Sequence, residues 1–557
     1  MGNLFFKHFE ETKLTSSVVR IENGLIVGKQ FDVGNGRLVD AFLGIPFAKP
    51  PMGELRYQKP QKPESWEGVR ECKKHGPRAP QVTLPIEKLS MRIPTSEDCL
   101  YLNVFAPEPF ADQEHRLAVM VFIPGGGFAT HTSANYGDIG ICRHLCTKDV
   151  VVVTTQYRLG MLGFMATGDE NCISNLGLRD QAFALQWVKD NIAAFGGDPN
   201  NITIFGQSAG GASVDMLCLS PYTRDLFSKV VPMGGSAYCE WATNTAESIM
   251  DAAMERARLH GWSPPANENE LSSSLMEFLK KQPSKNLALG ILPTRKKETR
   301  QSGLYFVPII DGDFLPEPVA ELRKKTPKKI CMIGTTEYEG LLFAAAAKGH
   351  FGVKATKKMI PSRITPDQFP DYEELRKKAV SLYVKEGQSR SEQDHGYVKL
   401  LSDIFITNAV HDFAEDMTQA GHTVYLYCFN YFDADKMGLL KYFFPFEGST
   451  HSAELPYLFA KGMLAPFNPT PIDLRVLENF TTIFTNFAKY GDPNGTSADK
   501  KWEPLTPSDT YKYMCIGEEL IMKSDYEERR AAFWRELKNR TEAEAARKED
   551  EKVDERM

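Results

Sequence analysis

The most informative segment of this sequence is Asn201-Ile-Thr-Ile-Phe-Gly-Gln-Ser-Ala-Gly-Gly211. Residues 202–205 form a short β-rich apolar run, and the small residues from Ala209 onward predict a helix. Between them, Gly206-Gln207-Ser208-Ala209-Gly210 fits G-x-S-x-G, which in a strand–turn–helix context marks a sharp turn carrying a nucleophilic serine. Glycines suit such a turn because a Cβ on either flank would collide with neighbouring elements. The segment therefore predicts that the Ser208 hydroxyl stands above a sheet edge, at the start of a helix.

Outward from this segment, strand-like and helix-like patterns alternate. Residues 180–195 predict a helix, because Leu185, Val188, Ile192 and Phe195 share one face and two glycines follow. Apolar runs of strand length occur at 100–105, 117–123, 150–156, 229–231, 330–333 and 423–429. This alternation predicts an α/β fold with a central, mostly parallel sheet flanked by helices.

The chain is organised as one large domain with insertions. The stretches 245–281 and 365–419 have helical patterns, and we expect them to cover the sheet without extending it. No segment between Ser16 and Trp534 is long and polar enough to be a linker. We therefore expect a flexible N-terminus at 1–15, a single domain at 16–535, and a charged tail at 536–557 that is helical or disordered.

Composition excludes several function classes. Of 557 residues, 42% are hydrophobic and 25% charged, which is typical of a globular protein and not of a disordered one. The net charge of -6 without a strong basic patch disfavours a nucleic-acid partner. No apolar run approaches the roughly 18 residues of a membrane span, so no transmembrane segment is expected.

The first residues also lack the apolar core of a secretory signal, and a cytoplasmic location is expected. N-myristoylation at Gly2 is disfavoured because Phe6 stands where that motif has Ser or Thr.

A second glycine-rich signal follows the predicted strand that ends at Ile123. It reads Pro124-Gly125-Gly126-Gly127-Phe128. Adjacent glycines leave backbone N–H groups accessible, and together with the Ala209 N–H they can surround a developing oxyanion. The other interpretation is a flexible connector, but a glycine loop after an early strand is typical of the oxyanion loop in such folds.

A serine hydroxyl needs a base, and the base needs an orienting acid. His451 lies in a loop beyond the last predicted strand. In this fold the acid falls between serine and histidine in chain order. Gly334-Thr-Thr-Glu-Tyr-Glu-Gly340 follows the strand predicted at 330–333 and offers Glu339, with Glu337 as a competitor. From these residues alone, both carboxylates remain candidates.

Three further motifs, together with Phe205-Gly-Gln-Ser-Ala-Gly-Gly211, make a family resemblance visible: Phe42-Leu-Gly-Ile-Pro-Phe-Ala48, Ser96-Glu-Asp-Cys-Leu-Tyr-Leu-Asn-Val104 and Asn175-Leu-Gly-Leu-Arg-Asp-Gln181. From about Ile21 to Trp534 the chain resembles the type-B carboxylesterases, the α/β-hydrolases that include cholinesterases and liver-type carboxylesterases. The resemblance implies an α/β-hydrolase fold. No cofactor is expected, and no metal is assigned, because Cys142, His144 and Cys146 do not share one helical face. It also implies structural ion pairs of Arg56 with Glu97 and of Arg158 with Asp180. It assigns the catalytic roles to Ser208, Glu339 and His451, and the oxyanion hole to the amides of Gly126, Gly127 and Ala209.

The chain departs from the family pattern at three positions near this site. Pro124 stands where many members have His or Tyr, and Gln207 replaces the commoner Glu before the nucleophile. Gly234 takes the place of a serine often found near the acid. Cys72 and Cys99 match a disulfide of secreted members, yet we expect all ten cysteines to be reduced.

The expected function is hydrolysis of a small-molecule carboxylic ester through an acyl-enzyme. An acyltransferase that uses the same three residues with an alcohol or amine acceptor is the first alternative. A non-catalytic binding or adhesion protein on the same scaffold is the second, and it is disfavoured because the serine is retained.

Overall fold

The computed structural model describes residues 14–83, 93–108, 116–290, 304–345, 351–462 and 466–554. Most of the expected flexible N-terminus, including Gly2, lies outside these residues. Within them, no helix is both long and apolar enough to cross a lipid bilayer.

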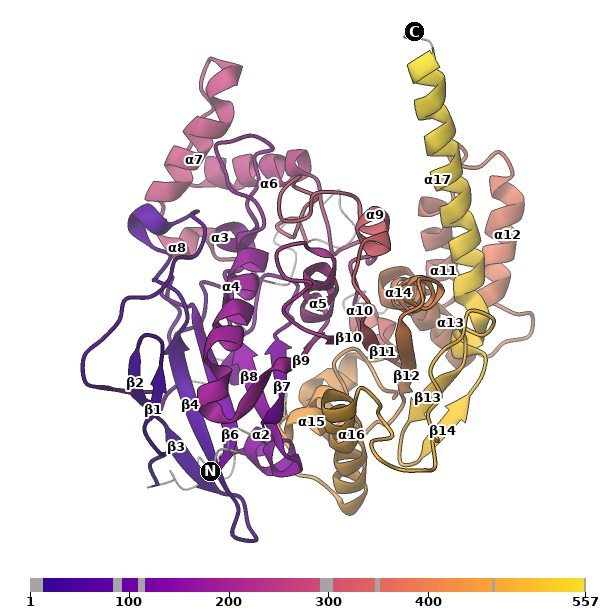
Figure 1. Ribbon diagram of the computed structural model, residues 1–557. Coiled ribbons are helices and arrows are strands. Elements are labelled where there is room, and N and C mark those ends of the chain that lie inside the picture. The colour runs from indigo at the N-terminus through magenta and orange to yellow at the C-terminus, as the bar shows by residue number, and fades with distance from the viewer. Residues whose placement is uncertain are drawn as a thin grey trace.

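The described chain builds an eleven-stranded central sheet (Figure 1). Seven neighbouring strands run parallel, and the strands at the two ends pair antiparallel. The order across the sheet is β14 (Leu520–Lys523), β13 (Tyr513–Ile516), β12 (Thr423–Phe429), β11 (Ile330–Thr336), β10 (Lys229–Met233), β9 (Gly197–Gln207), β7 (Leu117–Ile123), β8 (Val150–Thr155), β6 (Tyr101–Glu108), β4 (Leu38–Pro46) and β3 (Lys29–Asp32). A separate small sheet joins β1 (Val19–Ile21), β2 (Gly24–Val27) and β5 (Val69–Glu71).

The central strands are apolar throughout because both of their faces are buried. In β7, Val119 and Val121 point into one core cluster, while Met120 and Phe122 point into the other. The predicted mostly parallel α/β sheet is therefore confirmed.

Helices cover both faces of this sheet. One face carries α4 (Leu176–Asn191), α5 (Ala209–Leu219) and α14 (Asn408–Gln419), whose apolar residues join the first cluster. The other face carries α2 (Ile139–His144), α15 (Leu455–Phe459) and α16 (Pro471–Tyr490). The predicted helix at 180–195 starts earlier, at Leu176, and its last four residues form a 3-10 turn that ends at Gly196 in a left-handed conformation.

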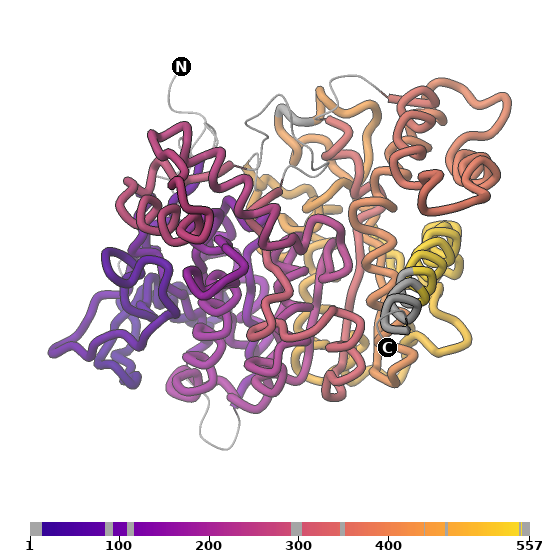
Figure 2. The backbone as a smooth tube through the Cα atoms, turned by 90° about the horizontal axis from the view of Figure 1, so that it is seen from above, coloured from indigo at the N-terminus to yellow at the C-terminus, as the bar shows by residue number. Residues whose placement is uncertain are grey.

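The two long helical stretches are each divided into several helices. The first contains α6 (Ala246–Leu259) and α7 (Leu271–Lys281). The second contains α12 (Tyr372–Tyr383), α13 (Arg390–Ser402), a π-helix at Asp403–Thr407, and α14. In the view from above (Figure 2), the segment 353–402 and the C-terminal helix lie at the opposite side of the molecule from the N-terminal strands.

The C-terminal helix α17 (Arg530–Asp554) begins at a buried charge pair. Arg530 Nε lies 2.6 Å from Asp403 Oδ2, and both side chains are almost fully buried. Further along the helix, Leu537 packs into an apolar cluster with residues of the α12 region. The packed part of the helix thus extends past residue 535.

The two expected structural ion pairs are present. Arg56 pairs with Glu97 and also donates to the carbonyl oxygens that end α7. Arg158 pairs with Asp180 at 2.7 Å, where the carboxylate also accepts the Arg158 backbone amide. Both pairs tie loops to helices near the sheet, which supports their assignment as scaffold.

Candidate active site

Ser208 occupies the turn between β9 and α5 in a strained conformation. Its φ is +59° and its ψ is -124°, and its amide donates to Met233 O at 2.8 Å. The flanking positions must be glycine because a side chain there would clash with the backbone. A Cβ on Gly206 would lie 2.6 Å from the Gly210 backbone, and one on Gly210 would lie 2.1 Å from Ile123 O. The turn predicted from the sequence is present, with a partly exposed Ser208 at the N-terminus of a buried helix.

The glycine loop after β7 lies directly against this turn. A Cβ on Gly125 would lie 2.3 Å from Gln207 O and 3.2 Å from Ser208 Cβ. Gly126 and Gly127 have φ values of +104° and +61°. The loop can approach the serine this closely only because it carries no side chains at these positions.

Three backbone amides remain available near Ser208. Those of Gly126 and Gly127 donate no hydrogen bond within the described part of the chain. The Ala209 amide is the first of α5, and first-turn amides have no partner inside their own helix. The glycine loop itself is anchored, because Tyr157 Oη donates to Pro124 O at 2.7 Å. The arrangement can accept a negatively charged oxygen.

The histidine and one of the two candidate carboxylates are in direct contact. His451 Nδ1 lies 2.5 Å from Glu339 Oε2, and both side chains are buried. The other oxygen, Glu339 Oε1, accepts the Thr336 amide at 2.8 Å. No hydrogen bond or ion pair between described residues joins Glu337 to His451. Burial raises the pKa of the Glu337 carboxyl, and the charge of Lys399 lowers it in part.

Gln207 connects the histidine with the serine turn. Its Nε2 lies 3.2 Å from His451 Nε2 and 3.4 Å from Nδ1, so the amide packs on the imidazole. Among the hydrogen bonds of the described residues, none joins Ser208 Oγ to His451. Such bonds are often long in the absence of substrate and tighten when it binds.

Gly234 stands next to the same carboxylate. A Cβ at this position would lie 3.0 Å from Glu339 Oε1 and 3.5 Å from His451 Cε1, and φ is +51°. A serine here would therefore place its hydroxyl at the acid. In this chain the position supplies no such group.

Aromatic side chains enclose the site. The Phe343 ring lies 5.6 Å from the His451 ring and 5.2 Å from Phe405, and Trp241 Nε1 donates to Phe405 O at 2.8 Å. Near the serine turn, a Cβ on Gly235 would lie 3.3 Å from Trp241 and 2.5 Å from Ser208 O. Sequence reasoning missed these aromatic residues because single aromatic residues in separate helices and loops form no motif.

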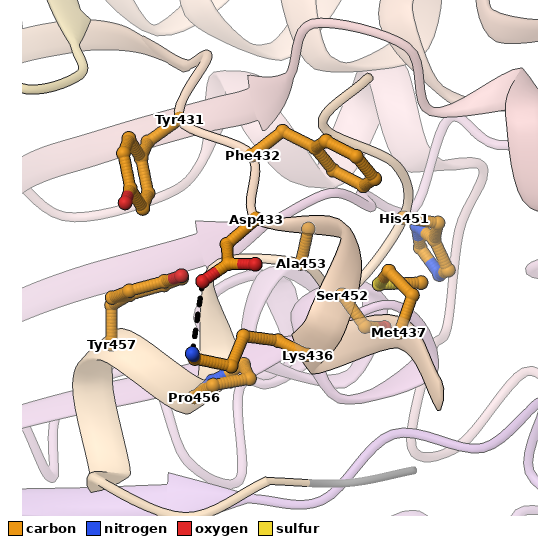
Figure 3. A pocket seen from close by; sticks show the side chains of 10 residues that line it. All are labelled: Tyr431, Phe432, Asp433, Lys436, Met437, His451, Ser452, Ala453, Pro456 and Tyr457. Carbon is orange, nitrogen blue, oxygen red and sulfur yellow. Dashed lines mark hydrogen bonds and ion pairs between the residues drawn. The ribbon is translucent and has the colours of Figure 1, made fainter. Parts of the chain in front are cut away.

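A small cavity is lined in part by His451 (Figure 3). Its volume is about 50 Å³, enough for roughly three or four water molecules or a short alkyl group. Phe432 and Met437 lie on the histidine side of this cavity, and Tyr431 and Tyr457 lie opposite. Lys436 also lines the cavity. Its Nζ lies 2.9 Å from Asp433 Oδ2 and 3.1 Å from Asp473 Oδ2.

The sheet order and the strand–turn–helix at Ser208 define an α/β-hydrolase fold. The carboxylesterase family model matches residues 15–534, which is most of the chain. Esterase cest-33 of Caenorhabditis elegans is 39% identical over 505 residues, covering 89% of this chain and 90% of that relative.

Two vertebrate relatives show the same relationship. Liver carboxylesterase 1 of Oryctolagus cuniculus is 31% identical, with 93% of each chain covered. Cholinesterase of Mus musculus is 32% identical, covering 93% of this chain and 86% of that one. The chain belongs to the carboxylesterase family.

Proposed function

We propose that this chain is a serine carboxylesterase in which Ser208 is the nucleophile, His451 the general base and Glu339 the orienting acid. The contact between His451 Nδ1 and Glu339 Oε2 at 2.5 Å is the observation that carries the proposal. A carboxylate in that place accepts the Nδ1 proton, so the lone pair of the imidazole stays on Nε2. Nε2 is the atom that must take the proton of a serine hydroxyl.

The reaction proceeds through a covalent intermediate. Ser208 Oγ attacks the ester carbonyl carbon while His451 Nε2 accepts the hydroxyl proton, which gives a tetrahedral oxyanion. The C–O bond to the alcohol then breaks, and His451 returns the proton to the leaving oxygen. Water attacks the acyl-serine, again with His451 as base, and the carboxylic acid leaves with Ser208 restored.

The amides of Gly126, Gly127 and Ala209 stabilise the oxyanion. They are held in place before substrate binds, because the glycine loop is anchored through Pro124 and the helix start through Ser208 N. Preorganised donors of this kind need no reorganisation during the reaction, and the loss of one typically costs about 10²–10³ in kcat.

The surroundings favour an uncharged ester. The Phe343 ring lies beside His451 and Trp241 lies beside the serine turn, and both present apolar surface without a charge. The relatives named as esterase and carboxylesterase support the same reaction class.

Replacement of the nucleophile tests the proposal. We expect Ser208→Ala to lower ester turnover by several orders of magnitude while the melting temperature stays the same, because alanine keeps the same Cβ in the same backbone conformation. Ser381→Ala, at an exposed position on α12, is the matched control and should retain full activity. An organophosphate should label Ser208 and no other residue. Turnover by Ser208→Ala equal to that of the wild type would refute the proposal.

A further inference from the structure

The loop that follows β10 lies against both the proposed nucleophile and the proposed acid. It consists of residues 234–239 and is called the β10 loop below. A Cβ on Gly234 would lie 3.0 Å from Glu339 Oε1, and a Cβ on Gly235 would lie 2.5 Å from Ser208 O. A shift of this loop would therefore reach the serine and the acid directly.

The start of the β10 loop has little rigidity of its own. The loop begins with two glycines, the first of which has a φ of +51°. Glycine has more accessible backbone conformations than other residues, and neither glycine has a side chain that could tie the loop to the acid. The residues that follow supply the ties: Ser236 Oγ donates to Ala409 O at 2.9 Å, and the Ala237 amide donates to Asp215 Oδ2 at 2.9 Å.

Asp215 is a buried charge on the helix that begins at the nucleophile. It lies about two turns after Ser208 on α5 and is fully buried. Arg323 of α9 (Val319–Lys324) binds both of its oxygens, with Nη1 at 2.9 Å from Oδ1 and Nη2 at 2.8 Å from Oδ2. Oδ2 is also the oxygen that accepts the Ala237 amide. The carboxylate therefore joins α5, α9 and the β10 loop at one point.

The guanidinium of Arg323 is itself held between two aromatic rings. Its central carbon lies 4.7 Å from the centre of the Tyr238 ring and 4.8 Å from that of Phe413 on α14. Tyr238 belongs to the β10 loop, and its hydroxyl donates to Asp416 of α14 at 2.6 Å. Burial acts to lower the pKa of the Arg323 guanidinium, but the charge of Asp215 raises it above its usual range. Arg323 thus remains a fixed cation beside the carboxylate.

The contribution of this ion pair to stability does not by itself explain its presence. A buried ion pair loses about as much free energy through desolvation as it gains through attraction, and well-packed apolar side chains often stabilise a fold equally well. Apolar side chains cannot, however, provide an acceptor for the buried Ala237 amide. This contact is what distinguishes the carboxylate from an apolar substitute.

We propose that Asp215 is a positioning residue of the esterase site, which holds the Ala237 amide, and through it the β10 loop, against Ser208 and Glu339. Arg323 keeps the carboxylate ionised and fixes the direction of its two oxygens. The inference rests on the proposed esterase function, because kcat reports how well the site is aligned.

Two double variants separate the amide contact from the ion pair. Asp215→Asn/Arg323→Met and Asp215→Leu/Arg323→Met both remove the two charges. Asparagine and leucine have nearly the same shape, but only asparagine keeps an oxygen for the Ala237 amide. We expect the asparagine variant to keep kcat within about threefold of the wild type. The leucine variant should lower kcat by about 10–100-fold and change KM less than about twofold. The rates are expressed per active site titrated with an organophosphate, so that unfolded molecules are not counted.

Hydrogen–deuterium exchange measures the same contact without catalysis. A peptide that spans the β10 loop should take up deuterium faster in the leucine variant than in the asparagine variant or the wild type, because the loop has lost one of its anchors. Equal kcat values in the two double variants would overturn the proposal, and so would equal deuterium uptake.

The matched control removes a second buried pair. Arg179 Nη2 lies 3.2 Å from Asp311 Oδ2, both side chains are almost fully buried, and Asp311 Oδ1 accepts the Leu315 amide at 2.9 Å. Among the described residues, no hydrogen bond joins the loop 311–315 to the β10 loop or to the serine turn. Asp311→Leu/Arg179→Met should therefore keep kcat per active site within about twofold of the wild type. A loss as large as that of Asp215→Leu/Arg323→Met would overturn the proposal, because the removal of any buried pair would then have this effect.

If Asp215→Leu/Arg323→Met fails to fold, Asp215→Ala/Arg323→Met removes the same acceptor with less bulk, and its comparison with the asparagine variant decides. Failure of the esterase proposal itself is read separately, from Ser208→Ala.

Discussion

At the scale of single residues, the backbone of Ser208 is the most constrained feature of the site. A non-glycine residue with φ of +59° costs about 1–3 kcal/mol and persists only where its surroundings enforce it. Here the hydrogen bond to Met233 O and the close approach of Gly125 and Gly235 supply that constraint. The turn therefore holds Ser208 in one backbone conformation at the start of α5.

The choice between two carboxylates gives a residue-scale prediction. Glu339→Gln should lower kcat by about 10⁴, because an amide in this place favours the wrong imidazole tautomer. Glu337→Gln should change kcat little, because Glu337 does not contact His451. Steady-state rates on one soluble ester, with melting temperatures as the folding check, measure both. A larger loss in Glu337→Gln would move the orienting role to Glu337.

Sequence reasoning reached some of these residues and not others. The turn at Ser208 and the glycine loop after β7 were predictable because both need glycines at fixed spacing, which leaves a motif. Glu337 and Glu339 are indistinguishable from the residues alone because both follow β11 in the turn before α10 (Gly340–Ala345), and the path of that turn decides which side chain reaches the histidine.

At the scale of elements, the glycine loop after β7 is tested by adding a single methyl group. In Gly126→Ala the Cβ would lie 2.4 Å from Thr130 O, so the loop must shift. We expect kcat to fall by about 10²–10³, the cost of a lost oxyanion donor.

The control for this variant is Gly36→Ala, where φ is +71° but no atom lies within 4 Å of the new Cβ. It should cost about 1–2 kcal/mol of stability, from the left-handed conformation alone, and leave kcat unchanged. Equal kcat values for the two variants would exclude the loop from the oxyanion hole.

The bounds of strands that are buried on both faces were predicted correctly, whereas the ends of helices were predicted less accurately. Leu117–Ile123 and Thr423–Phe429 match their predicted bounds because each is a continuous apolar run between polar residues. The helix predicted from residue 180 starts at Leu176. The prediction missed its first turn because Arg179 and Asp180 are charged residues that are buried with partners, and they interrupt the apolar pattern of the buried face. The π-helix at Asp403–Thr407 was not predictable from its sequence.

At the scale of the whole molecule, all ten cysteines are buried free thiols, Cys72 and Cys99 included. Burial raises the pKa of the Cys72 thiol to about 11, and it also raises the pKa of Cys99. Because the thiolate is the reactive form, we expect almost no reaction of the native protein with a maleimide over minutes. In denaturant without reductant, mass spectrometry should count ten modified cysteines. Eight, with Cys72 and Cys99 unmodified, would indicate a disulfide and an oxidising compartment.

The order of the strands was beyond sequence reasoning. β9 pairs with both β7 and β10, and the pairing depends on helices that close over the sheet from distant segments. The sequence predicts the kind of sheet, since alternation and apolar runs are local properties. Which strands are neighbours is decided by packing between segments far apart in the chain.

The distance along the chain between the parts of the site has a consequence for synthesis on the ribosome. Gln207, next to the serine, and His451 are separated by 244 residues. At about 5–20 residues per second, the imidazole emerges roughly 10–50 s after the serine turn. For that interval the nascent chain exposes unpaired strand edges and lacks the proposed base. We therefore expect a truncated chain or a proteolytic fragment that ends before His451 to show no ester turnover.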